Sequence, residues 1–196
     1  IKYLPDFDIE PIVLTVDENY ASYPQTDKHL EKDIADKLKV YKTKTFEFFS
    51  LYQKLTNKKE IPFSGFANEK KVSFVQKISR FIRGNFFIPD PRKGWNRYAY
   101  KKAVEIIREN NINTVVTTGP PHSSQLIGLK LKKRFDIDWI ADLRDPWTDI
   151  YYYDKFYPTF ISKHIDKKYE KKVIHGCDKL IVVGKSMKDS LLERYN

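Results

Sequence analysis

The chain has 196 residues, of which 41% are hydrophobic and 32% are charged. This composition supplies enough apolar material for a packed core and excludes a disordered tail. The sequence contains no run of about 18 apolar residues, the length needed to span a bilayer. A single cysteine, Cys177, permits neither an internal disulfide nor a cysteine zinc cluster, which is typical of a reducing compartment such as the cytoplasm.

Basic residues exceed acidic residues by ten. Most of this surplus lies between Lys70 and Arg108, where eleven basic and two acidic residues give a net charge of +9. Such a concentration suits an anionic membrane, a nucleic acid or a phosphorylated substrate as partner.

The first elements in chain order are a helical turn and a strand. Ile1–Leu4 precedes Pro5 and is interpreted as the last turn of a helix, because proline ends helices. The apolar run Pro11–Val16 then predicts a buried strand. A helix that leads into a parallel strand normally follows another strand, so we expect a strand upstream of Ile1.

The next segments are a second strand, a helix and a loop. After a polar connection over 17–37, Leu38–Thr43 predicts a short strand. Phe46–Leu55 has apolar residues at helical spacing and predicts a helix, whereas 56–71 has no clear period and predicts an exposed loop.

Val72–Arg83 predicts an amphipathic helix in which Lys77, Arg80 and Arg83 flank an apolar stripe. Two interpretations stay open for this helix. It can pack on the core as an ordinary surface helix, or it can lie on an anionic leaflet with its basic residues at the lipid phosphates.

From Gly94 onward helices and strands alternate regularly. Helices are predicted over Gly94–Asn110, Ser123–Phe135, Ile161–His175 and Lys185–Tyr195, and strands over Thr114–Thr118, Trp139–Asp142 and Lys179–Val183. This alternation indicates right-handed crossovers and a parallel sheet covered on both faces. The sequence therefore predicts one doubly wound, Rossmann-like α/β domain over residues 1–196.

Ligands of open parallel sheets bind beyond the carboxyl ends of the strands, so the loops that follow strands are the candidate sites. The first is Thr117–Ser124 (TTGPPHSS). Gly119 permits a close approach to the backbone, Ser123 can cap the following helix, and that helix start favours an anion. His122 is expected at the mouth of the crevice. The alternative interpretation is a rigid turn with an ordinary helix cap.

The second loop is Asp142–Trp147 (DLRDPW), which places three charged residues directly after a strand. Such charges are costly beside an apolar strand unless they are paired or used. Arg144 is suited to a phosphate or carboxylate, Asp145 to sugar hydroxyls or a proton, and Trp147 offers a flat apolar face. An internal ion pair between Arg144 and Asp145 is the alternative.

A third candidate is Asp90–Trp95, where Arg92 and Lys93 lead into a helix; a solvated helix start explains these two residues equally well. The motifs of P-loop ATPases, metalloproteases and serine hydrolases are absent from the sequence, and no metal site is expected.

Four segments together resemble one protein family. Ile88–Trp95, Thr117–Ser124, Ile140–Trp147 and Cys177–Ser186 are similar to the N-terminal domain of bacterial family 4-like glycosyltransferases. The block Arg144–Trp147 is the most specific part of the match. The resemblance implies one half of a GT-B fold, in which two Rossmann-like domains face each other across a cleft.

The resemblance also implies a function. The N-terminal half would hold a glycan or lipid-linked acceptor, while a C-terminal Rossmann-like domain would hold most of a UDP- or GDP-sugar donor. The reaction implied is retaining, metal-independent hexosyl transfer, with Asp145 as the candidate catalytic residue and Gly119, His122, Ser123, Arg144 and Trp147 as substrate contacts. The glycine-rich loop and the donor-binding glutamate motif of the family have no counterpart here, so we expect a domain truncated at both ends and inactive alone.

Two further expectations concern partners and location. Lys77, Arg80, Arg83, Arg92 and Lys93 are expected to contact an anionic surface, which would place the protein in the cytoplasm or peripherally on the inner face of the cytoplasmic membrane. The alternative function is a basic nucleic-acid-binding or other anion-binding α/β module. The sequence contains no nucleic-acid-binding motif and no row of aromatic residues on which bases could stack. Both absences argue against nucleic acid as the partner.

Overall fold

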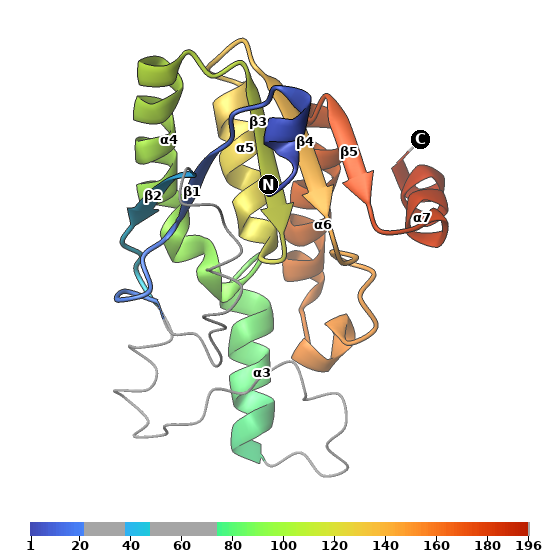
Figure 1. The fold of residues 1–196 in the computed structure, drawn as a ribbon. Coiled ribbons are helices and arrows are strands. Elements are labelled where there is room, and N and C mark those ends of the chain that lie inside the picture. The colour runs from blue at the N-terminus through green and yellow to red at the C-terminus, as the bar shows by residue number, and fades with distance from the viewer. Residues whose placement is uncertain (22–37, 48–73, 196) are drawn as a thin grey trace.

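The computed structural model describes residues 1–21, 38–47 and 74–195 (Figure 1). Its strands are β1 (Ile12–Val16), β2 (Lys39–Thr43), β3 (Thr114–Gly119), β4 (Asp138–Leu143) and β5 (Lys179–Val182). Its α-helices are α3 (Phe74–Phe86), α4 (Asn96–Asn110), α5 (Gln125–Lys132), α6 (Phe160–Gly176) and α7 (Lys185–Tyr195). Its short 3-10 helices are η1 (Leu4–Phe7), η3 (Pro91–Trp95), η4 (His122–Ser124) and η5 (Tyr153–Phe156).

The strands form two parallel sheets, β1–β2 and β3–β4–β5. Leu14 pairs with Tyr41 in the first sheet, and Thr117, Ala141 and Leu180 form one row across the second. The predicted mixed α/β architecture with parallel strands is confirmed. The described strands belong to two small sheets rather than to the single sheet that the alternation predicted.

Both sheets pack against the same layer of helices. Leu14 of β1 and Val115 of β3 contact one apolar cluster, which α4 and α5 supply mainly through Ala99, Ala103, Ile107, Ile127 and Leu131. Burial of these side chains holds the two sheets together in the absence of backbone pairing between them. Beneath β4, the fully buried Trp139 packs with Ala141 and Val173, and Leu143 packs with Met187 and Leu191 of α7.

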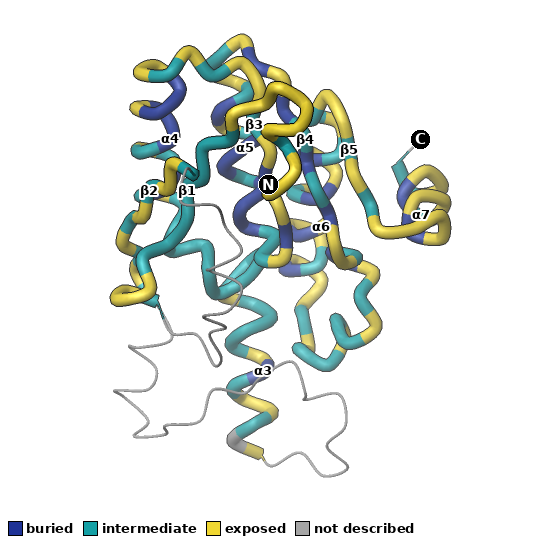
Figure 2. The backbone as a smooth tube through the Cα atoms, viewed as in Figure 1, coloured by how far each residue is buried: buried dark blue, intermediate teal, exposed yellow. Residues whose placement is uncertain are grey.

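Side chains of the second sheet alternate between a covered and an open face. Trp139, Ala141 and Leu143 of β4 are buried in the clusters that the helices complete. Buried and less buried residues alternate along the tube of β4 in Figure 2. On the other face Val116 is 57% exposed and Ile181 is 51% exposed. Within the described part of the chain, helices thus cover one face of β3–β4–β5, and coverage of both faces stays a prediction.

Several predicted boundaries differ from those of the structure. Ile1–Leu4 is not the end of a helix. Instead η1 begins at Leu4 and contains Pro5 in its first turn, where the backbone N–H that proline lacks is not needed. The residues of β1 are half-buried rather than buried. Phe46 and Glu47 are not helical, and the rest of the helix predicted over Phe46–Leu55 and the loop predicted over 56–71 lie outside the described residues.

Helix starts differ for a common reason. The helices predicted from Gly94 and from Ser123 each begin with a 3-10 turn, η3 and η4, before α4 and α5. Asp90 caps η3 by accepting a hydrogen bond from the Arg92 backbone N–H at 2.9 Å. Proline precedes or opens both turns and presets the backbone for a tight start.

Candidate functional site

A cavity of about 140 Å³ is lined by the loops that follow β3 and β4 at their carboxyl ends and by residues at the C-terminal end of α3. The loops after both strands reach it, as do α3 and η5. Its lining includes the side chains of Arg83, Asp90, His122, Asp145, Trp147, Tyr153, Phe156 and Asp166. The two proline-containing loops singled out in the sequence therefore meet at one opening. A hydrogen bond from the Arg144 N–H to the Gly119 carbonyl, 2.9 Å long, joins them directly.

In the first loop, the polar groups of Ser123 already bind an internal carboxylate, that of Asp90. The Ser123 N–H and hydroxyl donate to Asp90 at 2.7 and 2.8 Å, and Ser123 is only 1% exposed. Burial raises the pKa of Asp90, while the bonds from Ser123 and Arg92 oppose that shift. The helix start that was predicted to bind an external anion holds Asp90 instead.

His122 stacks on Trp147. The two ring centroids are 4.9 Å apart and the ring planes differ by 8°. Burial lowers the pKa of His122 to about 4, against the opposing effects of Asp145 and a hydrogen bond to the Pro146 backbone. The imidazole is therefore neutral at pH 7. Its Nδ1 is buried without a hydrogen-bond partner and faces Gly119, where a Cβ would lie 3.3 Å away.

In the second loop, Arg144 and Asp145 are exposed and Trp147 is 3% exposed. Among the described residues neither Arg144 nor Asp145 has an ion-pair partner, so the alternative of an internal Arg144–Asp145 pair does not describe this structure. One face of Trp147 is covered by His122 rather than left open for a ligand. Asp145 is the acidic group at the cavity whose carboxylate stays available.

The basic residues of α3 point in different directions. Lys77 is exposed, Arg80 is only 6% exposed, and Arg83 lines the cavity. The guanidinium carbon of Arg83 lies 4.4 Å from the centroid of the Phe156 ring, and burial lowers its pKa. A joint lipid contact by these three residues stays a prediction, and in this structure only Lys77 of the three is fully at the surface.

Arg92 and Lys93 hold the chain around η3. Arg92 is paired with Glu47, and the Lys93 ammonium donates to the Phe86 carbonyl at 2.8 Å. Both side chains therefore have internal partners at the junction between α3 and α4.

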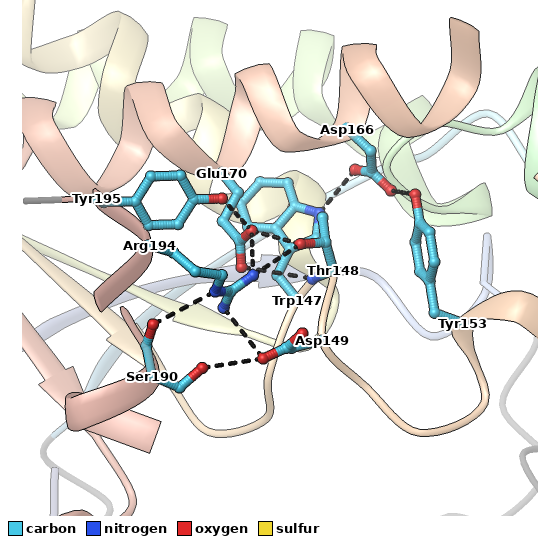
Figure 3. A network of polar contacts seen from close by, with 9 residues as sticks. All are labelled: Trp147, Thr148, Asp149, Tyr153, Asp166, Glu170, Ser190, Arg194 and Tyr195. Atoms are coloured by element: carbon cyan, nitrogen blue, oxygen red, sulfur yellow. Dashed lines mark hydrogen bonds and ion pairs between the residues drawn. The ribbon is translucent and has the colours of Figure 1, made fainter. Parts of the chain in front are cut away.

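Sequence reasoning did not single out a pair of buried acids on α6, Asp166 and Glu170 (Figure 3). Asp166 accepts hydrogen bonds from Trp147 Nε1 at 2.7 Å and from the Tyr153 hydroxyl at 2.9 Å. Glu170 accepts from Thr148 and Tyr195 hydroxyls, both at 2.6 Å, and pairs with Arg194 at 3.4 Å. The available signal was spacing, since Ser162, Asp166, Glu170 and Val173 recur on the buried stripe of this helix.

The chemistry of the cavity combines aromatic walls with a few polar groups. Phe156, Tyr153 and Trp147 supply flat apolar surface, Arg83 supplies donors and Asp145 supplies acceptors. A volume of about 140 Å³ is close to that needed for one six-membered ring. A cationic donor and a carboxylate acceptor at such a space suit a ring that carries hydroxyl groups.

Comparison with protein-family models, with curated protein sequences and with solved structures found no match for this chain. Within 1–21, 38–47 and 74–195, no three His, Cys, Asp or Glu side chains come together as a metal ion would require. None of the helices in these ranges has the length and apolar character needed to cross a membrane.

Proposed function

We propose that this chain is the acceptor-binding half of a retaining glycosyltransferase, one Rossmann-like domain of a GT-B enzyme. In this role the cavity at the carboxyl ends of β3 and β4 holds a sugar ring of a glycan or lipid-linked acceptor. A second domain of the same enzyme supplies most of the contacts to a UDP- or GDP-sugar, so this domain alone transfers no sugar.

The observation that supports the proposal most directly is the convergence of the two loops on one cavity. Pro120 and His122 come from the loop after β3, and Asp145 and Trp147 come from the loop after β4. These are the segments that carry the resemblance to family 4-like glycosyltransferases. Their position beyond the strand ends is the usual place for a ligand of a parallel sheet.

Asp145 is assigned the polar contact to the acceptor. Its side chain is exposed at the cavity and has no hydrogen bond or ion pair within the described residues, whereas Asp90 and Asp166 already accept from internal donors. A carboxylate in this state can accept a hydrogen bond from the hydroxyl that becomes the nucleophile. His122, which is neutral and has a buried Nδ1, is assigned to the wall of the site rather than to proton transfer.

The test is equilibrium binding of methyl glycosides of common hexoses to this chain, measured by saturation-transfer difference NMR. We expect at least one glycoside to bind, and Asp145→Ala to weaken it roughly tenfold through loss of a hydrogen bond to a charged group. Asp154→Ala is the matched control, because Asp154 is an exposed acid of the same region whose partner is Lys163 on the surface. It makes the same change in charge and should leave the affinity unchanged.

Binding of nucleic acid is the outcome that would contradict the acceptor-site proposal. The proposal predicts no salt-sensitive retention of a DNA duplex in a filter-binding titration, since binding to phosphates would fall steeply as salt rises. Tight, salt-sensitive DNA binding without binding of any glycoside would replace the acceptor-site proposal with the basic-module alternative.

A further inference from the structure

Asp166 connects two walls of the cavity. Its Oδ1 accepts from Trp147 Nε1 and its Oδ2 accepts from the Tyr153 hydroxyl, at 2.7 and 2.9 Å (Figure 3). Trp147 belongs to the loop after β4, and Tyr153 begins η5. All three residues line the cavity. A single buried carboxylate thus fixes two side chains that come from separate elements.

The contact extends through Trp147 to His122. His122 stacks on the indole with ring planes 8° apart, so the imidazole is in direct contact with the ring that Asp166 fixes. The imidazole also has a hydrogen bond to the Pro146 backbone, while its Nδ1 is buried without a partner among the described residues. Asp166 therefore acts on three wall residues, two directly and one through a ring stack.

The described surroundings of Asp166 oppose its negative charge and supply no cation to pair with it. Asp166 is 4% exposed, and the described part of the chain offers it no cation as ion-pair partner. Two further acids lie near Asp166: Glu170, one turn later on the same helix, and Asp90, at the start of η3. Trp147 and Tyr153 are the two groups that stabilise its negative charge by hydrogen bonds.

Resting on the acceptor site proposed above, we infer that Asp166 is a positioning residue, whose carboxylate holds Trp147 and Tyr153 at the separation that a sugar ring needs. The ionised form accepts both hydrogen bonds at once. A protonated carboxyl group has a hydrogen on one oxygen and no longer accepts equally from both donors.

The titration of Asp166 supports the same geometry. Burial raises the pKa of Asp166 to about 6, while the bonds from Trp147 and Tyr153 lower it and nearby Glu170 and Asp90 raise it. The carboxylate is therefore the main form at pH 7.5, and the two wall contacts weaken together as the pH falls through 6.

Glu170 is the natural comparison. It is fully buried and accepts from Thr148 and Tyr195, so it joins the loop after β4 to α7. It does not line the cavity. A purely structural role for buried acids on α6 would apply to both residues, whereas a positioning role applies to Asp166 alone.

The experiment follows the Trp147 indole N–H and the His122 ring by NMR between pH 5 and 8, in the wild-type chain and in Asp166→Asn, Tyr153→Phe and Glu170→Gln. The wild type should show both signals moving together with a midpoint near pH 6. An asparagine at 166 has one acceptor oxygen for two donors, so the midpoint should vanish and methyl glycoside affinity at pH 7.5 should fall about tenfold.

The variants separate the possible outcomes. Tyr153→Phe keeps the Trp147 bond and should retain the joint transition, with its midpoint at higher pH because the Tyr153 bond lowers the pKa of Asp166, and with weaker glycoside binding. Glu170→Gln removes a nearby negative charge, so it should retain the joint transition with a midpoint at lower pH and leave glycoside affinity unchanged. The inference is overturned if Asp166→Asn keeps the wild-type signals and affinity, or if all its effects follow a lower unfolding midpoint, as for a structural residue. If the wild type binds no glycoside, the proposed function fails, and the two NMR signals still decide the positioning role.

Discussion

At the scale of single residues, the buried acids explain how the loop after β4 keeps its shape. Trp147, Thr148 and Tyr153 have their side-chain donors satisfied by Asp166 and Glu170, which lie four positions apart and so face the same side of α6. The sequence showed the donors and acceptors but not their pairing. Trp147 was expected to offer a flat face to a ligand. Its buried indole N–H also needs an acceptor, and Asp166 of α6 supplies it. The sequence predicted this helix but not which of its residues would meet Trp147.

The stability of the protein should depend on the ionisation of Asp166. Burial raises its pKa to about 6 in the folded protein, above the value of about 3.9 in an unfolded chain. The stabilising effect of the protonated group is fully present below about pH 4 and is lost as the pH rises through 6. Relative to Asp166→Asn, the wild type should lose about 2 kcal/mol in the free energy of unfolding between pH 4 and pH 7.

Urea unfolding of both proteins at several pH values measures this difference. The comparison between the two proteins cancels the other acids, which titrate in both. A stability difference that is constant across this range would show that Asp166 is not buried as a titrating carboxyl group.

At the scale of elements, alternation located the second sheet well. Thr114–Thr118, Trp139–Asp142 and Lys179–Val183 match β3, β4 and β5 to within one residue at each end. Short apolar runs bounded by turn residues leave few other possibilities, and regular helices between them fix the parallel direction.

The orientation of α3 could not be predicted in the same way. The amphipathic pattern of Val72–Arg83 predicted a stripe of apolar residues with basic flanks, but a pattern does not say which side meets the rest of the chain. In the structure Phe74 and Ile78 are 76% and 45% exposed, whereas Arg83 points inward onto Phe156. The aromatic partner comes from η5, so no local signal could reveal it.

One glycine permits the packing of α5 on β4. A Cβ added at Gly128 would overlap the indole of Trp139, which is fully buried. Gly128→Ala should therefore lower the free energy of unfolding by about 3 kcal/mol, the cost of overpacking a rigid core. Gly184→Ala is the control, because nothing lies within 4 Å of a Cβ there, and its urea midpoint should stay within error of the wild type. Equal effects of the two substitutions would mean that α5 does not approach Trp139 this closely.

At the scale of the whole molecule, the positive charge is less concentrated than the sequence suggests. Within the basic segment Lys70–Arg108, Arg80 is buried, Arg83 lies in the cavity, Arg92 pairs with Glu47 and Lys102 pairs with Glu105. Burial or pairing of these cations reduces the continuous basic surface that a nucleic acid would need. Net charge was correctly counted from the sequence, but its distribution depends on tertiary partners.

The position of the two candidate loops at the carboxyl ends of strands was the part of the site that the sequence predicted best. Parallel strands bring their carboxyl ends to one edge, so GPPHSS and LRDPW had to meet once β3 and β4 were adjacent. The roles of individual side chains were harder to predict. Ser123 is taken by Asp90 from another element, 33 positions away, and that internal bond replaces the external anion that was expected.

Chemical-shift mapping of the ¹⁵N-labelled chain, titrated with the methyl glycoside that binds best, tests the central claim most directly. The claim predicts that the largest shifts cluster on the cavity, at His122, Asp145, Trp147 and Tyr153, with the exposed basic residues of α4, Arg97, Lys101 and Arg108, unaffected. Saturable shifts confined to α4 or to the open face of β3–β4–β5 would contradict it, because the ligand would then bind away from the meeting point of the two loops.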